Sequence, residues 1–192
     1  MNPKISDFGM ARLFVVDQTQ GNTNRVVGTY GYMAPEYALH GQFSVKTDVF
    51  SFGVLVLEII SGQKNGGIHY REDMEDLLSF VWRNWKNGST RNIMDPTLKN
   101  GSLNEIMRCI HIGLLCVQQN VAERPTMASV VLMLNSNSVA LPVPLEPAFF
   151  VGTRTGNTYN SRTMSSTESN QSRNISAQES VNEASITEPY PR

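Results

Sequence analysis

The stretch from Ser44 to Gly62, SVKTDVFSFGVLVLEIISG, restricts the fold of this chain more than any other feature. It is apolar almost all the way round a helix, and it is too long for a single strand. Gly62 is suited to end a helix, because glycine adopts the left-handed conformation without strain. We therefore predict that this stretch forms a buried helix at the core of the fold.

The same stretch does not predict a membrane span. Its longest apolar run, Phe52 to Ile60, is interrupted by Glu58, and it is far shorter than the roughly 18 residues that a spanning helix needs. The first residues, MNPKISDFG, contain no apolar signal region. We therefore expect a chain that is soluble and cytoplasmic as written.

Three further helices are expected after the core helix. Residues 73–88 carry apolar side chains at positions i, i+3, i+4 and i+7, with Asp73 as the expected N-cap. Ser102 and Glu105 form an S-x-x-E pattern, which predicts a capping box at the start of the next helix. The last helix is expected over residues 126–134. The expected fold class is therefore mainly α, with about four helices.

Two segments without helical periodicity flank these helices. Residues 1 to about 43 are rich in Gly, Thr and Asn, and they predict a long ordered loop. After about Asn137 the sequence turns to Pro and then to Ser, Thr, Asn, Gln and Glu, a composition that buries too little apolar surface to fold. We predict one domain over residues 1–135 and a disordered Ser/Thr-rich tail over residues 136–192.

The two cysteines are predicted to be free core thiols. Cys109 and Cys116 fall seven residues apart on one expected helix, a rise of about 10.5 Å. That separation exceeds the reach of a disulfide, roughly 7 Å between Cα atoms. A metal site would need short Cys or His spacings, and this pair does not supply them.

Several short motifs occur in an order that carries functional meaning. Asp7-Phe8-Gly9 stands near the start, and Ala34-Pro35-Glu36 follows within GTYGYMAPEY. In protein kinases these two motifs bracket the activation segment. The core-helix stretch DVFSFGVLVLEIISG and then ERPTM come next, in the order of a kinase C-terminal lobe. One D-F-G alone would recur by chance, but the ordered set predicts a protein kinase.

On these motifs the chain closely resembles the C-terminal part of plant receptor-like kinases of the interleukin-receptor-associated-kinase-like group. Residues 17–65 look most like the cysteine-rich receptor-like kinases, and the S-locus lectin receptor kinases are the nearest rivals. The resemblance covers residues 1 to about 135. It implies a partial protein-kinase-like C-terminal lobe and, from the form GTxGYMAPEY, transfer of the ATP γ-phosphate to protein Ser or Thr.

The resemblance also implies a role for each residue of the D-F-G motif. Asp7 would coordinate Mg²⁺ on the ATP phosphates, because a hard divalent ion prefers carboxylate oxygens. Phe8 would pack beneath the nucleotide site, and Gly9 would allow the backbone to turn. ATP and Mg²⁺ are therefore the cofactors expected of the parent family.

Residues 10–33 resemble an activation loop. A phosphate group adds roughly −1.5 to −2 charges and can order such a loop against arginines. Thr23 is the leading candidate, and Thr29 resembles a position that lines the substrate site. The candidate phosphorylation sites are Thr19, Thr23 and Thr29.

Three further residues match structural positions of the family. Glu36 and Arg124 match a buried ion pair that ties the end of the activation segment to the loop before the last helix. Asp48 resembles the carboxylate that holds the backbone of the catalytic loop. All three are expected to support the site without reacting.

The remaining parts of kinase catalysis do not occur in these 192 residues. No Gly-rich loop, strand lysine or H-R-D catalytic loop is present, and HYRED, residues 69–73, lies after the D-F-G with the wrong spacing. We expect a fragment that begins within a kinase domain, that transfers no phosphate alone, and that does not bind ATP usefully. Two function classes stay open: a piece of an ATP-dependent Ser/Thr kinase, or a non-catalytic lobe acting as a binding or decoy module.

The expected partners follow from the same resemblance and from the charge. They are protein substrates or other kinases, and the formal net charge of −1 gives no basic surface for nucleic acid. The parent family is expected at the plasma membrane, with its kinase domain on the cytoplasmic side.

Overall fold

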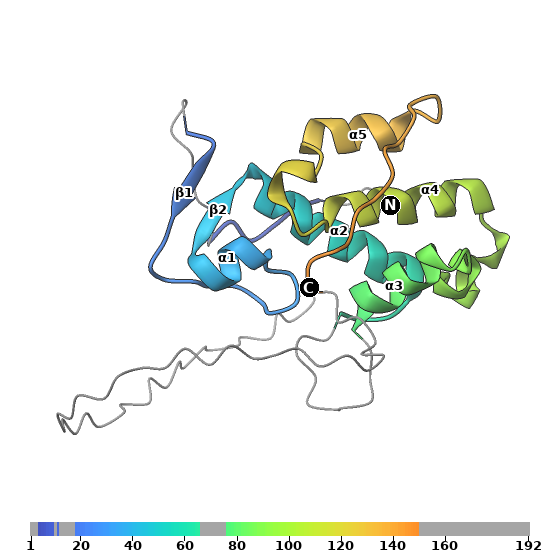
Figure 1. Ribbon diagram of the computed structural model, residues 1–192, viewed down its shortest axis with the longest axis horizontal. Coiled ribbons are helices and arrows are strands. Elements are labelled where there is room, and N and C mark those ends of the chain that lie inside the picture. The colour runs from blue at the N-terminus through green and yellow to red at the C-terminus, as the bar shows by residue number, and fades with distance from the viewer. Residues whose placement is uncertain (1–3, 10, 12–17, 66–75, 150–192) are drawn as a thin grey trace, which may run out of the picture. The chain divides into compact units, whose positions relative to one another are not determined.

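A computed structural model describes residues 4–9, 11, 18–65 and 76–149 of the chain (Figure 1). Its regular elements in this range are mainly α-helical, as predicted. In chain order they are β1 (Gln20–Asn22), α1 (Pro35–His40), β2 (Gln42–Ser44), α2 (Val45–Ser61), α3 (Leu77–Lys86), η1 (Thr90–Ile93), η2 (Pro96–Asn100), α4 (Leu103–Cys116), η3 (Val121–Glu123) and α5 (Met127–Asn135), where η marks a 3₁₀-helix.

Helix α2 is the predicted core helix, and both of its ends are fixed by its own sequence. At the start, Ser44 Oγ accepts a hydrogen bond from Lys46 N (3.1 Å), and Ser44 N donates to Thr47 Oγ1 (2.9 Å). At the end, Gly62 adopts φ 65°, a left-handed conformation that costs glycine little. The helix contributes a large share of the core, with Val49, Phe50, Val54 and Leu57 fully buried. The prediction of a buried central helix is confirmed.

Helix α4 lies along α2, and glycines set how closely the two helices approach (Figure 1). A Cβ atom on Gly53 would lie 2.6 Å from Cys116 Cβ, and one on Gly113 would lie 2.7 Å from Leu57 Cδ2. Both distances are shorter than carbon atoms tolerate without displacement. Side chains larger than hydrogen at these two positions would therefore push the helices apart.

The caps predicted for two helices differ from those in the structure. The N-cap of α3 is Asp76, whose Oδ1 accepts a hydrogen bond from Ser79 N at 3.0 Å, and the predicted cap Asp73 lies outside the described residues. Ser102 is the N-cap of α4, but its side chain makes no capping hydrogen bond. The predicted capping box with Glu105 is therefore wrong, because the serine supplies only its backbone conformation.

The segment predicted as a long loop contains short regular elements. β1 pairs with β2 in antiparallel register, with Gln20 opposite Ser44, and α1 lies between them in sequence. Strands of three residues and a helix of six are too short to produce a detectable period. Their pairing places residues 20–22, near the middle of the segment, next to the start of α2.

The chain after α5 stays packed well beyond residue 135. Ala148 is fully buried within the same core cluster as Phe50 and Leu57, and Gln118 pairs with Pro147 as an isolated β-bridge. The predicted tail boundary at residue 136 is therefore too early for residues 136–149. The rest of the predicted tail, residues 150–192, lies outside the described residues. Among the described helices, none has both the length and the apolar character to cross a membrane.

Candidate functional site

The D-F-G motif lies at the start of the described chain, in an exposed turn. Asp7 adopts φ 61°, a region that aspartate tolerates better than most residues. Its Oδ1 accepts a hydrogen bond from Gly9 N at 3.3 Å, so the carboxylate itself holds the turn. Phe8 is 69% exposed, which differs from the packed position that the resemblance implies.

Asp7 fits a magnesium site as one ligand of several. Within the described ranges, no group of three or more His, Cys, Asp or Glu side chains is arranged to hold a metal ion. Mg²⁺ bound with a nucleotide is usually held by only one or two carboxylates, together with phosphate oxygens and water. The exposed carboxylate of Asp7 has the chemistry for that part.

The three candidate phosphorylation sites have different surroundings. Thr23 forms a local turn, in which its Oγ1 donates to Arg25 O (3.1 Å) and accepts from Arg25 N (3.2 Å). Its backbone N donates to Gly41 O (2.9 Å), next to β2. Thr19 and Thr29 are exposed. Thr23 is thus the candidate whose hydroxyl already has a partner within its own loop.

Glu36 and Arg124 lie together in the structure, although 88 positions separate them in the sequence. The guanidinium donates from Nη1 to Glu36 Oε1 (2.8 Å) and from Nη2 to Glu36 Oε2 (2.9 Å), a bidentate geometry. The Arg124 side chain is completely buried, and the Glu36 side chain is 13% exposed. This ion pair joins the end of the segment that begins at Asp7 to the loop before α5.

The ion pair is surrounded by further contacts from α2. Thr47 Oγ1 lies 3.4 Å from Glu36 Oε1, and Lys46 Nζ donates to the backbone oxygen of Arg124. The Phe50 ring lies beneath the guanidinium, with Arg124 Cζ 5.0 Å from its centroid. These neighbours satisfy the groups that burial removes from water, as a buried charge requires.

Asp48 stands near the start of α2 but does not join these contacts. Its carboxylate has no hydrogen-bond partner among the described residues, and it faces solvent. Partial desolvation by the adjoining protein surface nevertheless raises the pKa of Asp48 above its usual value. Asp48 is thus an exposed carboxylate in the first turn of α2.

One polar contact in this region, made by Tyr32, was not predicted by the sequence analysis. Tyr32 Oη donates to both carboxylate oxygens of Glu58, at 2.9 and 3.0 Å, and this hydrogen bond is the main reason that the pKa of Tyr32 is raised. Ser51 Oγ also donates to Tyr32 O (2.6 Å). The available signal was Glu58 itself, a carboxylate that interrupts the apolar run of the core helix.

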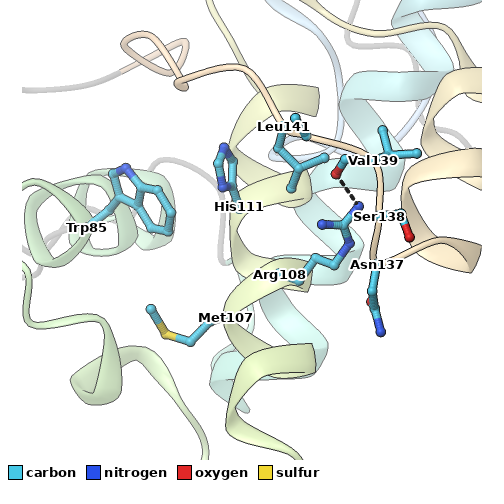
Figure 2. Close-up of a pocket in the computed structure, with 9 residues that line it drawn as sticks. Trp85, Met107, Arg108, His111, Asn137, Ser138, Val139 and Leu141 are labelled. Atoms are coloured by element: carbon cyan, nitrogen blue, oxygen red, sulfur yellow. Dashed lines mark hydrogen bonds between the residues drawn. The ribbon is translucent and has the colours of Figure 1, made fainter.

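A surface cavity of about 400 Å³ lies elsewhere, between α3, α4 and the chain after α5 (Figure 2). The rings of Trp85 and His111 are 4.9 Å apart on one side of it. Arg108 lies across from them and donates to Val139 O at 3.0 Å. None of the predicted site residues lines this cavity.

Comparison with known proteins places the chain among kinases. Residues 1–134 match the family described as protein tyrosine and serine/threonine kinase. The chain is 54% identical to cysteine-rich receptor-like protein kinase 8 of Arabidopsis thaliana over 194 residues, which is 100% of this chain and 28% of that relative. It is 65% identical to kinase 29 of the same series and organism over 153 residues, 78% of this chain and 22% of that relative.

A third relative, Arabidopsis thaliana cysteine-rich receptor-like protein kinase 44, is 55% identical over 196 residues, 100% of this chain and 49% of the relative. The chain thus spans between about a fifth and a half of the length of these curated relatives. The predicted resemblance to plant cysteine-rich receptor-like kinases is confirmed.

Proposed function

Because the chain belongs to the protein tyrosine and serine/threonine kinase family, we propose that it supplies the activation segment and C-terminal lobe of a receptor-like Ser/Thr kinase. The observation that carries the proposal is the buried, bidentate Glu36–Arg124 pair at the end of the segment that starts at Asp7. The names of the relatives, receptor-like kinases, support a place for this lobe at the cytoplasmic face of the plasma membrane.

In this proposal the lobe positions groups and does not itself form bonds to phosphate. Mg²⁺, when bound with ATP, neutralises the charge that develops on the transferred phosphoryl group. Asp7 would supply one carboxylate oxygen to that ion. Tyr32, held by Glu58 and by Ser51, fixes the GTYGYMAPEY stretch on α2. Thr29 then lies within the part of the segment that faces a protein substrate.

Thr23 is proposed as the regulatory phosphorylation site. Its hydroxyl group at present exchanges hydrogen bonds with the backbone of Arg25, two residues along the chain. A phosphate on Thr23 would add about two negative charges. It could form charge-assisted hydrogen bonds with the guanidinium of Arg25. Mass spectrometry of the active kinase should find phosphate on Thr23, with Thr19 or Thr29 as secondary sites. Full occupancy at Thr19 with none at Thr23 would contradict this order.

The 192-residue chain alone is proposed to be inactive. It has no Gly-rich loop, strand lysine or H-R-D loop, and each of these positions the phosphates or the hydroxyl nucleophile in kinases. Purified chain mixed with Mg²⁺, radiolabelled ATP and a Ser/Thr peptide should transfer no label. Transfer above that of a heat-denatured sample would refute this part of the proposal.

The catalytic part is tested by a chimaera in which this chain replaces the matching residues of cysteine-rich receptor-like protein kinase 8, to which it is 54% identical. The chimaera should label Ser or Thr. Asp7→Asn should lower the rate by at least about a hundredfold, since a catalytic metal stabilises charge by several kcal/mol. Glu105→Gln, an exposed carboxylate on α4, serves as the control. Phosphotyrosine as the main product, or an Asp7→Asn variant of undiminished rate, would contradict the proposal.

A further inference from the structure

The chain after α5 is held along its length by three side chains that contact its backbone. We call residues 136–149 the strap. Arg108 Nη2 donates to Ser136 O (2.7 Å) and to Val139 O (3.0 Å), the second of which Figure 2 shows. His111 Nε2 lies 2.7 Å from Pro142 O, and Leu145 N donates to Gln118 Oε1 (2.7 Å). The first two side chains project from α4, and the third lies just beyond its end.

The last residues of the strap pair with the backbone that follows α4. Ala148 N donates to Val117 O (3.0 Å), and Gln119 N donates to Glu146 O (3.1 Å). Ala148 is fully buried. These contacts show that the strap belongs to the packed lobe. It does so although the family match ends at residue 134, before the strap begins.

Gln118 connects the strap to the ion pair. Its side chain is nearly fully buried, and all of its amide groups have partners: Oε1 accepts from Leu145 N, and Nε2 donates to Glu123 O (2.8 Å) and Leu115 O (3.1 Å). Its backbone oxygen accepts from Arg124 Nε at 2.8 Å. The same residue therefore touches the strap with its side chain and Arg124 with its backbone.

A second contact leads from the strap to the same guanidinium. Phe149, the last described residue of the strap, packs edge-on against Phe50, with ring centroids 6.4 Å apart. The Phe50 ring also lies against the guanidinium of Arg124. The strap thus reaches the ion pair both through a hydrogen-bond chain and through an aromatic contact.

We propose that the strap is a positioning element for the Glu36–Arg124 ion pair, and that Gln118 is the residue through which it acts. Undocking the strap would leave Gln118 Oε1 buried without a donor, which is costly. The amide would rotate or the backbone would shift, and Arg124 would lose the carbonyl that orients its Nε. The carboxylate of Glu36 would then be held less firmly. Any effect of the strap on phosphate transfer rests on the proposed function. The coupling between the strap and the Glu36–Arg124 ion pair does not.

Hydrogen exchange on the full chain tests this coupling without measuring phosphate transfer. The amides of Tyr37 and Ala38 both donate to Ala34 O, so they report on the turn that carries Glu36. Gln118→Met keeps the side-chain volume and removes all three hydrogen bonds of the side-chain amide. It should speed exchange at Tyr37 and Ala38 about five- to tenfold, the effect of about one lost hydrogen bond. The matched control is Gln119→Met, at an exposed neighbour, and it should change neither amide.

The route through Arg124 is tested in an Arg124→Met background. There Gln118→Met should have no further effect on the exchange of Tyr37 and Ala38, because the residue that transmits the effect is already absent. The proposal is overturned if the Gln118→Met effect persists in that background. It is also overturned if exchange rises only at the amides of Leu145 and Ala148.

A second pair of variants covers the case in which Gln118→Met does not fold. Ala148→Glu places a charge in a buried position of the strap and should release it, whereas Val143→Glu adds the same charge to a strap residue that is 81% exposed. Ala148→Glu should speed exchange at Tyr37 and Ala38, and Val143→Glu should not. Equal effects from the two variants would contradict the proposal. Because exchange needs no substrate, this result is independent of whether the proposed kinase function holds.

Discussion

Replacing Arg124 by alanine is the substitution whose cost can be worked out most directly from the structure. It removes a completely buried guanidinium that donates two hydrogen bonds to Glu36 and one to Gln118 O. It also removes the cation that lies over the Phe50 ring. What remains is a mostly buried carboxylate, with the hydroxyl of Thr47 3.4 Å from its Oε1.

The expected loss follows from that orphaned carboxylate. Breaking a buried ion pair by deleting one partner costs about 3 to 5 kcal/mol. Because the Glu36 side chain is 13% exposed, water can reach it in part, and we expect a value near the lower end, about 3 kcal/mol. Against a typical domain stability of about 5 to 15 kcal/mol, the variant should unfold at a clearly lower denaturant concentration.

Urea denaturation followed by circular dichroism measures this loss as a shift of the midpoint at constant slope. Arg91→Ala is the control, since Arg91 is exposed and surface substitutions usually change stability by less than about 0.5 kcal/mol. Arg124→Met combined with Glu36→Gln should recover much of the loss, because no charge is then left buried alone. A cost below about 1 kcal/mol for Arg124→Ala would refute the reasoning, since it would mean that the pair is solvated.

Three other predictions concern contacts of α2 and α4. Gly53→Ala should destabilise the chain by about 1 to 3 kcal/mol, measured in the same denaturation assay, because the new Cβ would lie 2.6 Å from Cys116 Cβ; an unchanged midpoint would contradict the close approach. Tyr32→Phe should cost about 1 kcal/mol. The hydrogen bond to Glu58 raises the pKa of Tyr32, so its contribution to stability is present below about pH 10 and is lost as the pH rises through the folded-state pKa. In Tyr32→Phe, the unfolding free energy should therefore no longer fall with pH in this range for that reason. Burial raises the pKa of Cys116 to about 12, so iodoacetamide at pH 8 should label Cys109 first and Cys116 only after unfolding, as mass spectrometry would show.

Local sequence signals predicted the position of the core helix and the kinase motifs. Ser44 and Gly62 end α2 where the pattern places them, because a serine cap and a left-handed glycine act through atoms only a few residues away. Signals of the same kind failed at α4, where the S-x-x-E pattern is present but the Ser102 side chain makes no capping bond. A short motif states which hydrogen bond is possible, and the packing of the neighbouring turn decides whether it forms.

In the candidate site, too, some contacts could be predicted from the sequence and others could not. The type and order of Asp7, Glu36 and Arg124 indicated a kinase, and the structure brings the last two within 2.8 Å. The hydrogen bond between Tyr32 and Glu58 joins residues 26 positions apart, and no periodicity relates such residues. It was therefore not predicted, although an acidic residue within an apolar run was visible.

The sequence by itself thus determined the kinase family, the central helix and the residues that form the ion pair. These features depend on local hydrogen bonding, apolar periodicity and motif order, all of which can be read along one dimension. Only the tertiary structure decided that residues 136–149 belong to the lobe. Their Pro-rich composition predicts no folded element, but Arg108, His111 and Gln118 bind their backbone. Backbone groups are the same in every sequence, so their partners become known only when the chain has folded.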